Sequence, residues 1–546
     1  MAHRTLLIAF TLAAAIAARA SAQQTDVIRG RVTGPDSLPV PGAEVTATSY
    51  AGGISKTATT DRSGRYTIVF INGEGDYWLD FRKLGLAMRR FEIKKIGDEE
   101  VLIADARMRS TIAELDAISV TAQRDRALPN RNASPDVGGG EKPLTNNNVF
   151  VSPDQAGNLA AMAAAVAGIQ MVPGLDGAAD MFSVLGLTGD QNNVTYNGLG
   201  SGVNSLPPDI LATTTINPYP FDASIGGFSG AQVSVRTIPG SNYSRRSVSG
   251  MGVAPPLEWS DAAAAAQGQK YTNLRIGGNA AGAIAPDRVF YNGAYNVQRR
   301  FKPAETLLNA NPLGLEAAGV APDSVTRLLS VLGGVGIPLT TSSVPTVQAQ
   351  DLVQAAANFD IMPSSSGTGN SFVVGALGDY QRSEPVSRGG TLLTMPSHGG
   401  ATSFWGTNLA LIHSNYFWFG ILSKTTIGVA ASGSSSEPYL RLPEGSVRVA
   451  SALDDGSIAV KPLFFGGNSA LSSLTNQTMQ AMNQLSWYSA DNTHTLKISS
   501  SVARDAFQSD AAPSLLGTYT FNSLDDLASG SPNSFTRTLS SERRSG

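Results

Sequence analysis

The sequence predicts a mainly β protein in which a small β-sandwich, an α+β domain and the antiparallel strands of an incomplete transmembrane β-barrel follow one another. Three observations predict this fold class. Short β-rich runs separated by turn residues fill residues 25–110, a domain almost without Lys and Arg covers residues 149–245, and alternating segments recur through residues 246–546. Alternation with a period of two is the pattern of strands that have two unlike faces.

Residues 1–22 have the features of a secretory signal peptide. His3 and Arg4 form a basic start, Leu6–Ala18 is apolar except for Thr11, and Ala20–Ala22 has the small-x-small cleavage pattern. A membrane anchor is the alternative. The apolar stretch would span only ~20 Å as a helix, which is less than the ~30 Å hydrocarbon core of a bilayer. We therefore expect an exported chain.

The composition excludes several classes of function. Cysteine is absent, which removes disulfides, thiolate nucleophiles and Cys-metal sites together. The four histidines, at positions 3, 398, 413 and 494, lack metal-ligand spacing, and the sequence contains no P-loop, HExxH or G-x-S-x-G motif. The formal net charge of −3 does not indicate a nucleic-acid partner. We expect no enzyme activity, no cofactor, no metal and no nucleic acid.

A helical membrane span is not expected after the signal. The apolar stretch 156–172 comes closest to the ~18 residues required, but Gly157, Asn158, Gly168 and Gln170 interrupt it. An exported chain without such a helix can still be integral to a membrane as a closed β-barrel, because a barrel pairs all its backbone groups internally.

Residues 25–110 predict a small antiparallel sandwich. Val27–Val32, Ala43–Ala47 and Tyr66–Phe70 are short β-rich runs with turn signals between them. In the run Tyr77–Phe81, Tyr77, Leu79 and Phe81 alternate with Trp78 and Asp80, so one strand has two faces. Several short strands at this spacing are typical of a sandwich.

These residues resemble the carboxypeptidase regulatory-like domain, a transthyretin-like sandwich. The resemblance rests on the motifs Gly30-x-Val32, Pro41-Gly42-Ala43-x-Val45, Thr60-Asp61-x-x-Gly64-x-Tyr66 and Gly75-Asp76-Tyr77. It implies a binding or spacer module and not a peptidase.

A strand-like segment and a polar linker make up residues 111–148. The segment Asp116–Ala122 reads Asp-Ala-Ile-Ser-Val-Thr-Ala, and residues rich in Pro, Gly and Asn follow it. In an extended chain, Ile118 and Val120 lie on one face and Ser119 and Thr121 on the other. A last strand of the preceding sandwich is one interpretation of this segment.

The other interpretation comes from a resemblance to the TonB box of TonB-dependent receptors, in which an acidic residue precedes a hydrophobic-x-Val-Thr-Ala pattern. The resemblance implies that Asp116, Ile118, Val120, Thr121 and Ala122 bind a TonB-type periplasmic energy-coupling protein. Such a segment would pair edge-on with a strand of its partner, through backbone hydrogen bonds.

Residues 149–245 form the charge-poor domain. Between Leu144 and Val235 the sequence has no Lys or Arg and only six Asp. A free domain with so little charge would be poorly soluble, so we expect it to be enclosed. A helix-like stretch ends at Ile169–Gly174, and strand-and-turn units follow at Phe182–Leu187 and Asn193–Gly198. A Gly-rich tract then leads into an alternating strand that ends at Thr237.

This order resembles the plug domain of TonB-dependent receptors. One departure is Leu185, which stands where the family typically has an Arg that anchors the plug to acidic barrel residues. The resemblance therefore leaves the seating of this plug open. Asn192, Asn193, Asn197 and Asn204 could bind a ligand, but turn formation is favoured.

Residues 246–546 contain segments that alternate as outer-membrane barrel strands do. They are Tyr271–Ala280, Arg288–Gln298, Leu352–Ile361, Ser371–Tyr380, Ser403–Ile412, Tyr416–Ala430, Met479–Ser489 and Thr493–Ala503. Aromatic residues near their ends fit an interface girdle, namely Phe290, Tyr291, Tyr295, Trp405, Tyr416–Phe419 and Trp487–Tyr488. A soluble sandwich is disfavoured, because so many strands would need several sandwiches of roughly 100 residues each.

Three loop-like tracts, 306–338, 437–473 and 515–537, fit the longer extracellular loops of such barrels. The segments give ten or eleven strands by a generous count, whereas a plugged barrel of this kind has about 22. The chain also ends in Arg-Arg-Ser-Gly rather than in an aromatic strand. We therefore expect an N-terminal fragment of a longer receptor.

The expected function is that of a TonB-dependent outer-membrane receptor, which binds and imports a ligand with energy from an inner-membrane partner. The expected location is the outer membrane, with the regulatory-like domain in the periplasm. The expected partners are a TonB-type protein, outer-membrane lipid and an extracellular ligand whose identity the sequence leaves open. The alternative is an exported surface adhesion or carbohydrate-binding β-protein without transport activity.

Overall fold

The computed structural model describes most of the chain. The described residues are 25–50, 52–71, 75–95, 101–110, 142–144, 157–166, 168–172, 180–200, 205–217, 229–238, 241–257, 271–342, 344–363, 370–387, 391–417, 420–468, 471–489, 494–511, 514–539 and 542–545. The expected signal peptide and the segment Asp116–Ala122 lie outside these residues, so both remain expectations.

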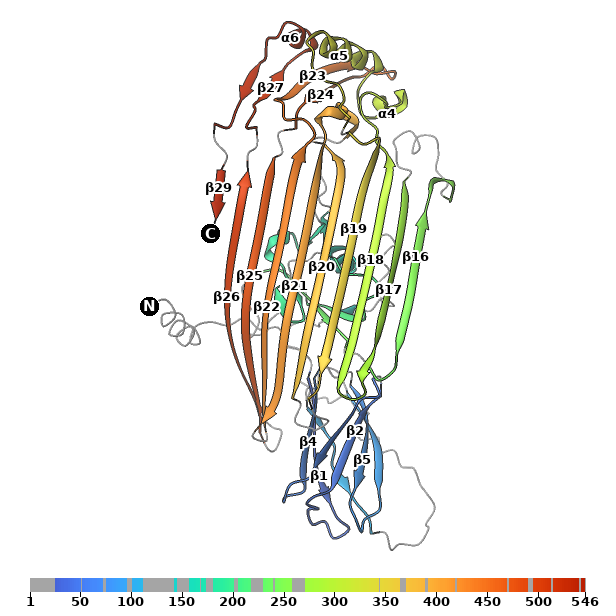
Figure 1. Cartoon of the computed structure of the whole chain (residues 1–546), viewed down its shortest axis with the longest axis vertical. Helices are drawn as coiled ribbons and strands as arrows, with labels where there is room; N and C mark the ends of the chain where they lie inside the picture. Colours follow the sequence, from blue (N-terminus) through green and yellow to red (C-terminus); the bar gives the residue numbers. More distant parts are fainter. Residues whose placement is uncertain are drawn as a thin grey trace, which may run out of the picture.

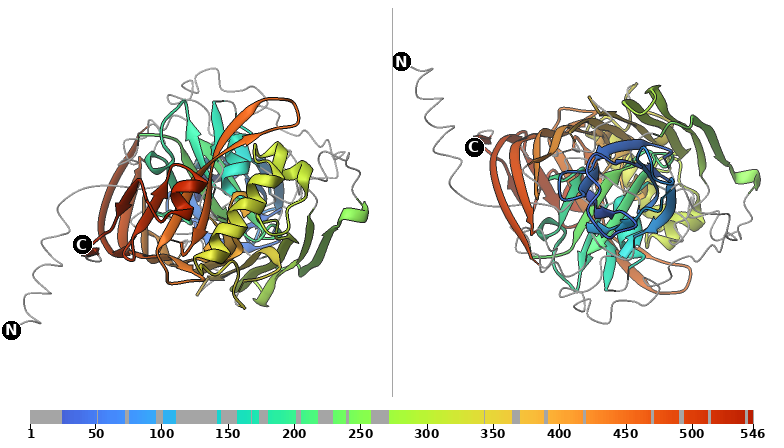
Figure 2. Two further views of the ribbon diagram at one scale, coloured as in Figure 1. Left: turned by 90° about the horizontal axis from the view of Figure 1, so that it is seen from above. Right: turned by 90° about the horizontal axis from the view of Figure 1, so that it is seen from below.

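The described residues form four parts, which are arranged along one long axis (Figure 1). A two-sheet sandwich, residues 25–110, occupies one end. A sheet of ten long strands forms the middle, and an inner unit, residues 142–238, lies against one face of it (Figure 2). A small α+β cap covers the other end. The mainly β fold class is confirmed.

The sandwich consists of two facing sheets, with strand orders β4-β1-β7 and β3-β2-β5-β6. Its strands are β1 (Thr25–Thr33), β2 (Glu44–Ser49), β3 (Ser55–Thr59), β4 (Arg65–Ile71), β5 (Asp76–Arg82), β6 (Arg89–Lys94), β7 (Val101–Ile103) and β8 (Ala106–Arg107). The prediction of purely antiparallel sheets was wrong in one respect. Both β7 and β8 pair in parallel with β1, because the chain returns to β1 through the opposite sheet.

The sandwich core follows the alternation that the sequence predicted. Tyr77, Leu79 and Phe81 of β5 are all fully buried. Tyr66 packs edge-on against Phe81 with 5.7 Å between ring centroids, and its hydroxyl donates to the Ala104 carbonyl at 2.6 Å. A buried polar group is tolerated when it is hydrogen-bonded in this way.

The charged residues Asp26 and Lys56 are fully or almost fully buried in the sandwich. Asp26 accepts a hydrogen bond from the Tyr77 hydroxyl at 2.6 Å and forms an ion pair with Lys95 at 2.6 Å. Lys56 donates to the Val69 carbonyl at 2.8 Å, and its burial lowers the pKa of its ammonium to about 8. Through these contacts, Asp26 of β1 connects to Tyr77 of β5 and to Lys95, which helps fix how the two strands pack.

The ten-stranded sheet is antiparallel throughout, in the order β16-β17-β18-β19-β20-β21-β22-β25-β26-β29. Its strands are β16 (Arg245–Val253), β17 (Thr272–Ala285), β18 (Val289–Pro303), β19 (Val347–Ile361), β20 (Ser371–Val386), β21 (Gly400–Phe417), β22 (Ile421–Pro438), β25 (Ser472–Tyr488), β26 (Thr495–Ala511) and β29 (Glu542–Ser545). All eight alternating segments of the sequence fall on strands of this sheet. In the described part of the chain, β16 and β29 are its edges.

One segment boundary was wrong. The predicted segment Tyr416–Ala430 spans two strands, since Tyr416 and Phe417 end β21 and β22 begins at Ile421. Their pairing is that of a tight hairpin, because Phe417 lies opposite Ile421. The strong β character of the residues on both sides of this turn hid it in the sequence.

Each long strand has an apolar face and a polar face. In β19 the even positions Gln354, Asn358 and Asp360 are buried against the inner unit, whereas Val353 and Phe359 are exposed on the opposite face. Directly opposite residues of paired strands share a face, so the register carries this division from strand to strand. We call the face toward the inner unit the inner face and the other the outer face.

The inner unit contains α2 (Leu159–Ala164), β10 (Ile169–Val172), β11 (Met181–Val184) and a five-stranded sheet. That sheet, in the order β13-β12-β15-β14-β9, is formed by β9 (Lys142–Leu144), β12 (Asn193–Tyr196), β13 (Leu199–Gly200), β14 (Ala212–Asn217) and β15 (Gln232–Thr237). The helix-like stretch of the sequence is shorter than expected. Residues Ile169–Val172 form a strand instead, because they pair with Met181–Val184.

Three insertions between strands of the large sheet supply the helices and strands of the cap, and Met395, from the segment between β20 and β21, joins its core. The first, after β18, contributes α4 (Pro312–Ala317) and α5 (Pro322–Gly334). The second, after β22, contributes β23 (Glu444–Ala452) and β24 (Ile458–Gly466). The third, after β26, contributes β27 (Thr518–Phe521), α6 (Leu524–Ala528) and β28 (Ser534–Thr536). The three tracts predicted as separate loops therefore form one body, with a sheet in the order β24-β23-β27-β28.

A shared hydrophobic core holds the cap together. Val325, Leu328 and Leu332 lie on one face of α5 and pack with Val447 of β23 and Phe521 of β27. Their spacing of three and four residues is that of an amphipathic helix. None of the helices in the described ranges is long and apolar enough to cross a membrane.

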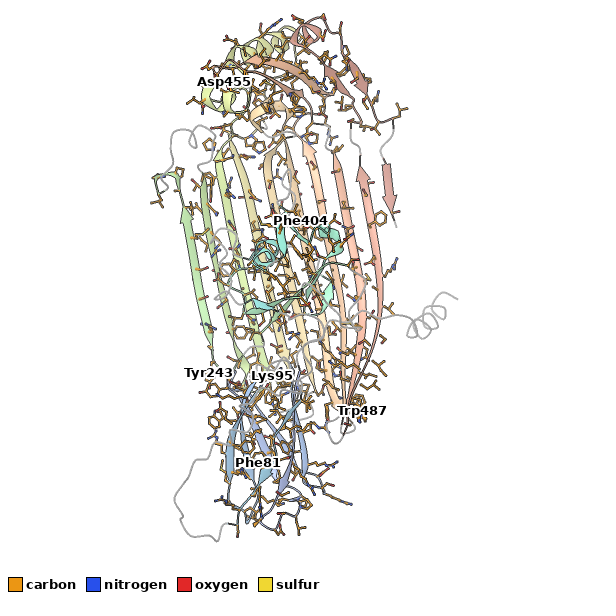
Figure 3. All side chains as sticks on the ribbon, turned by 180° about the vertical axis from the view of Figure 1, so that it is seen from behind. Phe81, Lys95, Tyr243, Phe404, Asp455 and Trp487 are labelled. Atoms are coloured by element: carbon orange, nitrogen blue, oxygen red, sulfur yellow. The ribbon has the colours of Figure 1, made fainter. Side chains whose placement is uncertain are left out.

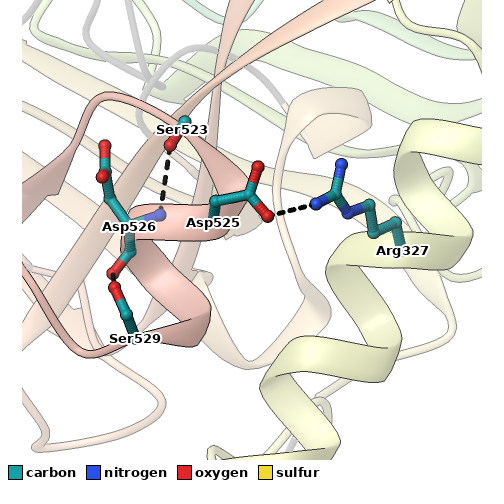
Figure 4. A network of polar contacts seen from close by, with 5 residues as sticks. All are labelled: Arg327, Ser523, Asp525, Asp526 and Ser529. Atoms are coloured by element: carbon teal, nitrogen blue, oxygen red, sulfur yellow. Dashed lines mark hydrogen bonds and ion pairs between the residues drawn. The ribbon is translucent and has the colours of Figure 1, made fainter.

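An ion pair joins the helices of two insertions on the cap surface (Figure 4). Arg327 of α5 pairs with Asp525 of α6. The Ser523 hydroxyl caps α6 by accepting from the Asp526 amide at 3.1 Å, and the Ser529 hydroxyl donates to the Asp526 carbonyl at 3.2 Å. The ion pair is exposed, so it contributes little, and burial of the apolar face of α5 contributes more.

We predict that Leu328→Ala destabilises the cap by about 2–5 kcal/mol, because it leaves a cavity in the shared core. Arg327→Ala, one residue away on the exposed face, is the matched control and costs less than about 1 kcal/mol. Amide hydrogen exchange of β23 and β27 measures both effects. Equal acceleration in the two variants would contradict the importance of the core.

Candidate functional site

The inner unit and the inner face of the large sheet share one apolar contact. Ala356 of β19 and Leu377 of β20 lie opposite each other and pack in the same buried cluster as Tyr196, Ile216 and Val233 of the inner unit. Small side chains at the wall allow the five-stranded sheet to approach it closely. This contact places the inner unit at mid-height of the large sheet (Figure 3).

Uncharged amides provide most of the polar contacts around it. Asn292 Nδ2 donates to the Leu211 carbonyl at 2.9 Å and to the Ile238 carbonyl at 3.1 Å. Asn279 Nδ2 donates to the Asp209 carbonyl at 2.7 Å, and the Ser249 hydroxyl donates to the Asp209 carboxylate at 2.6 Å. The wall thus binds backbone carbonyls of the charge-poor domain through neutral donors.

A further chain of hydrogen bonds joins three residues in the same way. Asn296 Nδ2 donates to Gln354 Oε1 at 2.8 Å, and Gln354 Nε2 donates to the Ser205 hydroxyl at 2.6 Å. Sequence analysis missed these wall amides. The sequence did carry a pattern that could have predicted them. Asn and Gln recur at alternate positions of strands that are otherwise apolar, which indicates a face that forms hydrogen bonds with the backbone of another domain.

Leu185 does not anchor the inner unit to the wall. It lies at the turn after β11 with a φ of 50°, and its side chain is 66% exposed. Gly186 follows with a φ of 87°, so the turn uses two residues in the left-handed region. Wall amides contact the inner unit elsewhere, as described above.

Two of the four candidate asparagines form hydrogen bonds within the inner unit. Asn192 Oδ1 accepts from the Ala231 amide at 2.9 Å, and its Nδ2 donates to the Phe182 carbonyl at 2.7 Å. Asn197 has a φ of 50° and its Oδ1 accepts from the Thr237 amide at 3.0 Å. The favoured interpretation as a turn residue is confirmed for Asn197, whereas Asn192 has an extended backbone after a short 3-10 helix. Asn193 lies in β12, and Asn204 lies outside the described residues.

The sandwich docks onto the near end of the large sheet through apolar side chains. Phe290 is fully buried and Met362 almost so, and both belong to the hydrophobic core of the sandwich. Tyr416 and Leu422 pack against Val27 and Val69 of the sandwich. The two parts therefore share a core rather than meeting through a hydrated linker.

The docking contact corrects the predicted aromatic girdle. Phe290 and Tyr416 lie on the inner face, where the sandwich covers them. Tyr295, Trp405 and Trp487 lie on the outer face and are 45%, 39% and 43% exposed. Neighbouring residues of a strand point to opposite faces, so a run such as Phe290-Tyr291 cannot place both rings on one face.

Polar contacts reinforce the docking. Asp287, in the turn between β17 and β18, accepts from the Ser55 amide at 3.1 Å and from Asn242 Nδ2 at 2.9 Å. Asn242 Nδ2 also donates to the Gly53 carbonyl at 3.0 Å, and Arg29 donates to the Ser489 carbonyl at 3.2 Å. In Figure 3, Tyr243 lies at the same height as Lys95, where the sandwich meets the sheet.

The described residues contain no group of three or more His, Cys, Asp or Glu side chains placed to hold a metal ion. A pocket lies where the cap joins the sheet. It is lined by residues of three segments that are distant in sequence, among them Thr306, Asn309, Thr346, Pro385 and Met395. Its lining combines hydroxyl, amide and apolar groups.

We predict that Phe290→Ala weakens the docking by about 3–5 kcal/mol, because it empties a buried position shared by both parts. The Ser55 amide reports docking directly, since it donates to Asp287. Its hydrogen exchange should accelerate in Phe290→Ala and stay unchanged in Phe359→Ala, whose ring is 43% exposed on the outer face. Unchanged exchange in both would show that Phe290 is not needed for docking.

Three solved structures illustrate what the chain is similar to. The outer membrane transporter YddB from Escherichia coli is 11% identical, with 74% of this chain and 55% of that chain covered and a TM-score of 0.44. The siderophore receptor PirA from Acinetobacter baumannii is 13% identical, with 68% and 54% covered and a TM-score of 0.39. Catechol 1,2-dioxygenase from Pseudomonas arvilla C-1 is 12% identical over 18% of this chain and 57% of that chain, with a TM-score of 0.16.

The chain thus spans about half the length of the two outer-membrane proteins. A comparison with curated protein sequences gave no match. The model of the carboxypeptidase regulatory-like domain matches residues 27–109, which are the two sheets of the sandwich. Residues 27–109 therefore belong to the carboxypeptidase regulatory-like domain family, as the motifs of the sequence predicted.

Proposed function

We propose that the chain is a TonB-dependent outer-membrane receptor, which binds an extracellular ligand and imports it with energy from an inner-membrane partner. One observation carries the proposal. From β17 to β22 the outer face of the large sheet is mostly apolar between its polar borders, while buried polar side chains lie on the inner face. A soluble protein rarely exposes apolar patches larger than a few hundred Å². In a water-soluble protein the apolar face of a sheet points inward and the polar face points to water. Here the apolar face points outward, as in a barrel wall that faces lipid.

The outer face is divided into horizontal rows by the strand register. Val297, Val353, Tyr380, Trp405 and Gly433 are successive cross-strand neighbours on β18 to β22. The Trp405 ring lies over Gly433, where a Cβ would come within 2.5 Å of the indole nitrogen. This row combines apolar and amphipathic aromatic side chains, as at a membrane interface.

The next row toward the cap is polar. It consists of Arg299, Asp351, Arg382, Ser403 and Ser435, and Arg299 forms an ion pair with Asp351 at 3.5 Å. The row thus marks an upper border at which charge begins. Charges here would lie in water or among lipid headgroups.

A lower border lies near the sandwich, where His413, Thr425 and Asn483 occupy outer positions in one row. Between Ser403 and His413 the outer positions of β21 are Trp405, Thr407, Leu409 and Leu411. The two borders, Ser403 and His413, are ~33 Å apart along the strand, or ~25 Å along the membrane normal at a tilt of ~40°. The distance between the borders is similar to the height of the apolar band of outer-membrane barrels.

We predict that Leu409→Arg, at the middle of this band, destabilises the chain in lipid by about 2–4 kcal/mol, because a charge would enter the hydrocarbon. Leu313→Arg is the matched control. Leu313 is equally exposed but lies on the cap, so its replacement costs less than about 0.5 kcal/mol. Denaturant unfolding in lipid vesicles measures both.

The same experiment distinguishes the proposed receptor from the alternative function. An exported adhesion or carbohydrate-binding protein would be water-soluble after signal removal, and Leu409→Arg would then cost no more than Leu313→Arg. A wild-type chain that stays monomeric without detergent and does not enter vesicles would contradict the membrane proposal.

In the proposed mechanism the inner unit is the plug, and the segment Asp116–Ala122 is the point of attachment for the TonB-type partner. The first described strand after this segment is β9, which lies at the edge of the five-stranded sheet. It pairs only with β14, through residues Thr214–Ile216. Tension on the preceding chain would therefore act first on a short edge strand, which has few bonds to lose.

We predict that Val120→Pro weakens binding of a TonB-type C-terminal domain about tenfold or more, because Pro removes a strand donor and fixes φ. Ala127→Pro, which lies outside the segment in the following linker, is the control and should bind like the wild type. A quantitative pull-down with detergent-solubilised chain measures both. Equal binding by Val120→Pro and wild type would count against this segment as the attachment point.

A further inference from the structure

We propose that the inner face of the large sheet binds an oxyanion, such as a carboxylate, sulfate or phosphate group, at a row of polar side chains centred on Lys424. Only the role of this site in import rests on the proposed receptor function. The proposal that the row binds an oxyanion rests on the register, burial and charge of its residues.

The strand register places five polar residues in one line. Ser371 lies opposite Ser414, Ser414 opposite Lys424, Lys424 opposite Gln484, and Gln484 opposite Ser499. These residues lie on the adjacent strands β20, β21, β22, β25 and β26. Neighbouring strands are ~4.8 Å apart, so the side chains form a continuous polar line across the wall.

The row is buried, yet several of its groups lack partners. Ser371, Ser414, Lys424 and Gln484 are all less than one tenth exposed. Among the described residues, Lys424 Nζ and the hydroxyls of Ser371, Ser414 and Ser499 have no hydrogen-bond partner. The Thr426 hydroxyl, on the same face of β22, also has none. An ammonium buried without a partner is costly, so the row is suited to a group that brings negative charge.

The chemistry of the row selects the kind of partner. An ammonium, hydroxyls and a primary amide can all donate hydrogen bonds. The row itself contains no carboxylate. Arg236 of β15 is the charged group of the inner unit that acts on Lys424, and it is also cationic. An oxygen-bearing anion accepts several charge-assisted bonds at once, which a simple halide does less well.

The nearest inner-face carboxylate by register is Asp360. It shares a row with Thr426, but Val373 and Ile412 lie between them. Three strand spacings separate Asp360 from Thr426, or ~14 Å. The carboxylate is therefore too far away to neutralise Lys424 by contact, so the site stays cationic.

The site lies where three parts meet. Two residues from Lys424 on the same face, Leu422 packs against Val27 and Val69 of the sandwich. The inner unit reaches β22 at Leu199, which lies against Gly428. An anionic group that passed between the inner unit and the wall would reach Lys424 just before the sandwich. We infer that an anionic ligand would bind to this row late in its passage, after passing the inner unit.

The test uses the full chain in detergent, with sodium sulfate as the probe and sodium chloride at matched ionic strength as the reference. Sulfate should raise the Tm of the wild type in a saturable way. Lys424→Gln should lose about tenfold or more in apparent affinity, and Ser414→Ala about two- to fivefold. Lys83→Gln in the sandwich is the matched control and should respond like the wild type.

A second measurement separates a binding role from a structural one. In sulfate-free buffer, Lys424→Met should have a higher Tm than the wild type, because it removes an unpartnered buried charge. A lower Tm, together with an undiminished sulfate response in Lys424→Gln, would overturn the proposal. Ser414→Ala keeps the charge and tests the row if the Lys424 variants do not fold.

Measuring Tm with other anions identifies the class of ligand. A response to acetate as strong as that to sulfate supports a carboxylate ligand, and a response to phosphate and sulfate without acetate supports a tetrahedral oxyanion. An equal response to chloride alone reflects screening and would overturn the site. None of these readouts depends on a TonB-type partner or on import, so a failed pull-down leaves them intact.

Discussion

The structure depends on the uninterrupted alternation of the ten-stranded sheet. A strand offers alternate side chains to opposite faces, and a slip of one residue would exchange the faces along its whole length. Here the register from β17 to β22 keeps mostly apolar side chains outside between two polar borders, and it keeps the amides that bind the inner unit inside. The outer apolar band, the seat of the inner unit and the polar row at Lys424 all follow from that one register.

The seat of the inner unit explains how a domain almost without Lys or Arg can be held. Its contacts are hydrogen bonds from Asn279, Asn292 and Gln354 together with one apolar patch at Ala356 and Leu377. Each neutral hydrogen bond contributes only ~0.5–1.5 kcal/mol, since water can replace the protein partner. Many such bonds together fix the position of the inner unit, but no single bond contributes most of the binding free energy. Under the proposed function, this combination would suit a unit that holds its place and can still be displaced.

The sequence predicted the strands well and their faces poorly. All eight alternating segments lie in the large sheet, because period two is a local property of each strand. The faces of Phe290 and Tyr416 were wrong, because alternation shows that two faces exist but not which one meets another domain. The cap could not be predicted, since its core joins Leu328 to Val447 and Phe521, which are far apart in the chain. Its insertions look like loops until they are brought together.

Under the proposed function, the sandwich and the inner unit would obstruct the same path, one behind the other. Seen along the long axis, the sandwich lies over the inner unit at the end of the sheet (Figure 2). It is held there by a shared core around Phe290 and by the contacts of Asp287. The segment Asp116–Ala122 lies between these two parts in the chain. Tension applied there would act in one direction on the last strand of the sandwich and in the other on β9. If a partner were attached at this segment, it would load both parts together, and the weaker one would yield first. Since β9 is a three-residue edge strand whereas the sandwich shares buried aromatic side chains with the sheet, the inner unit would begin to open before the sandwich undocks.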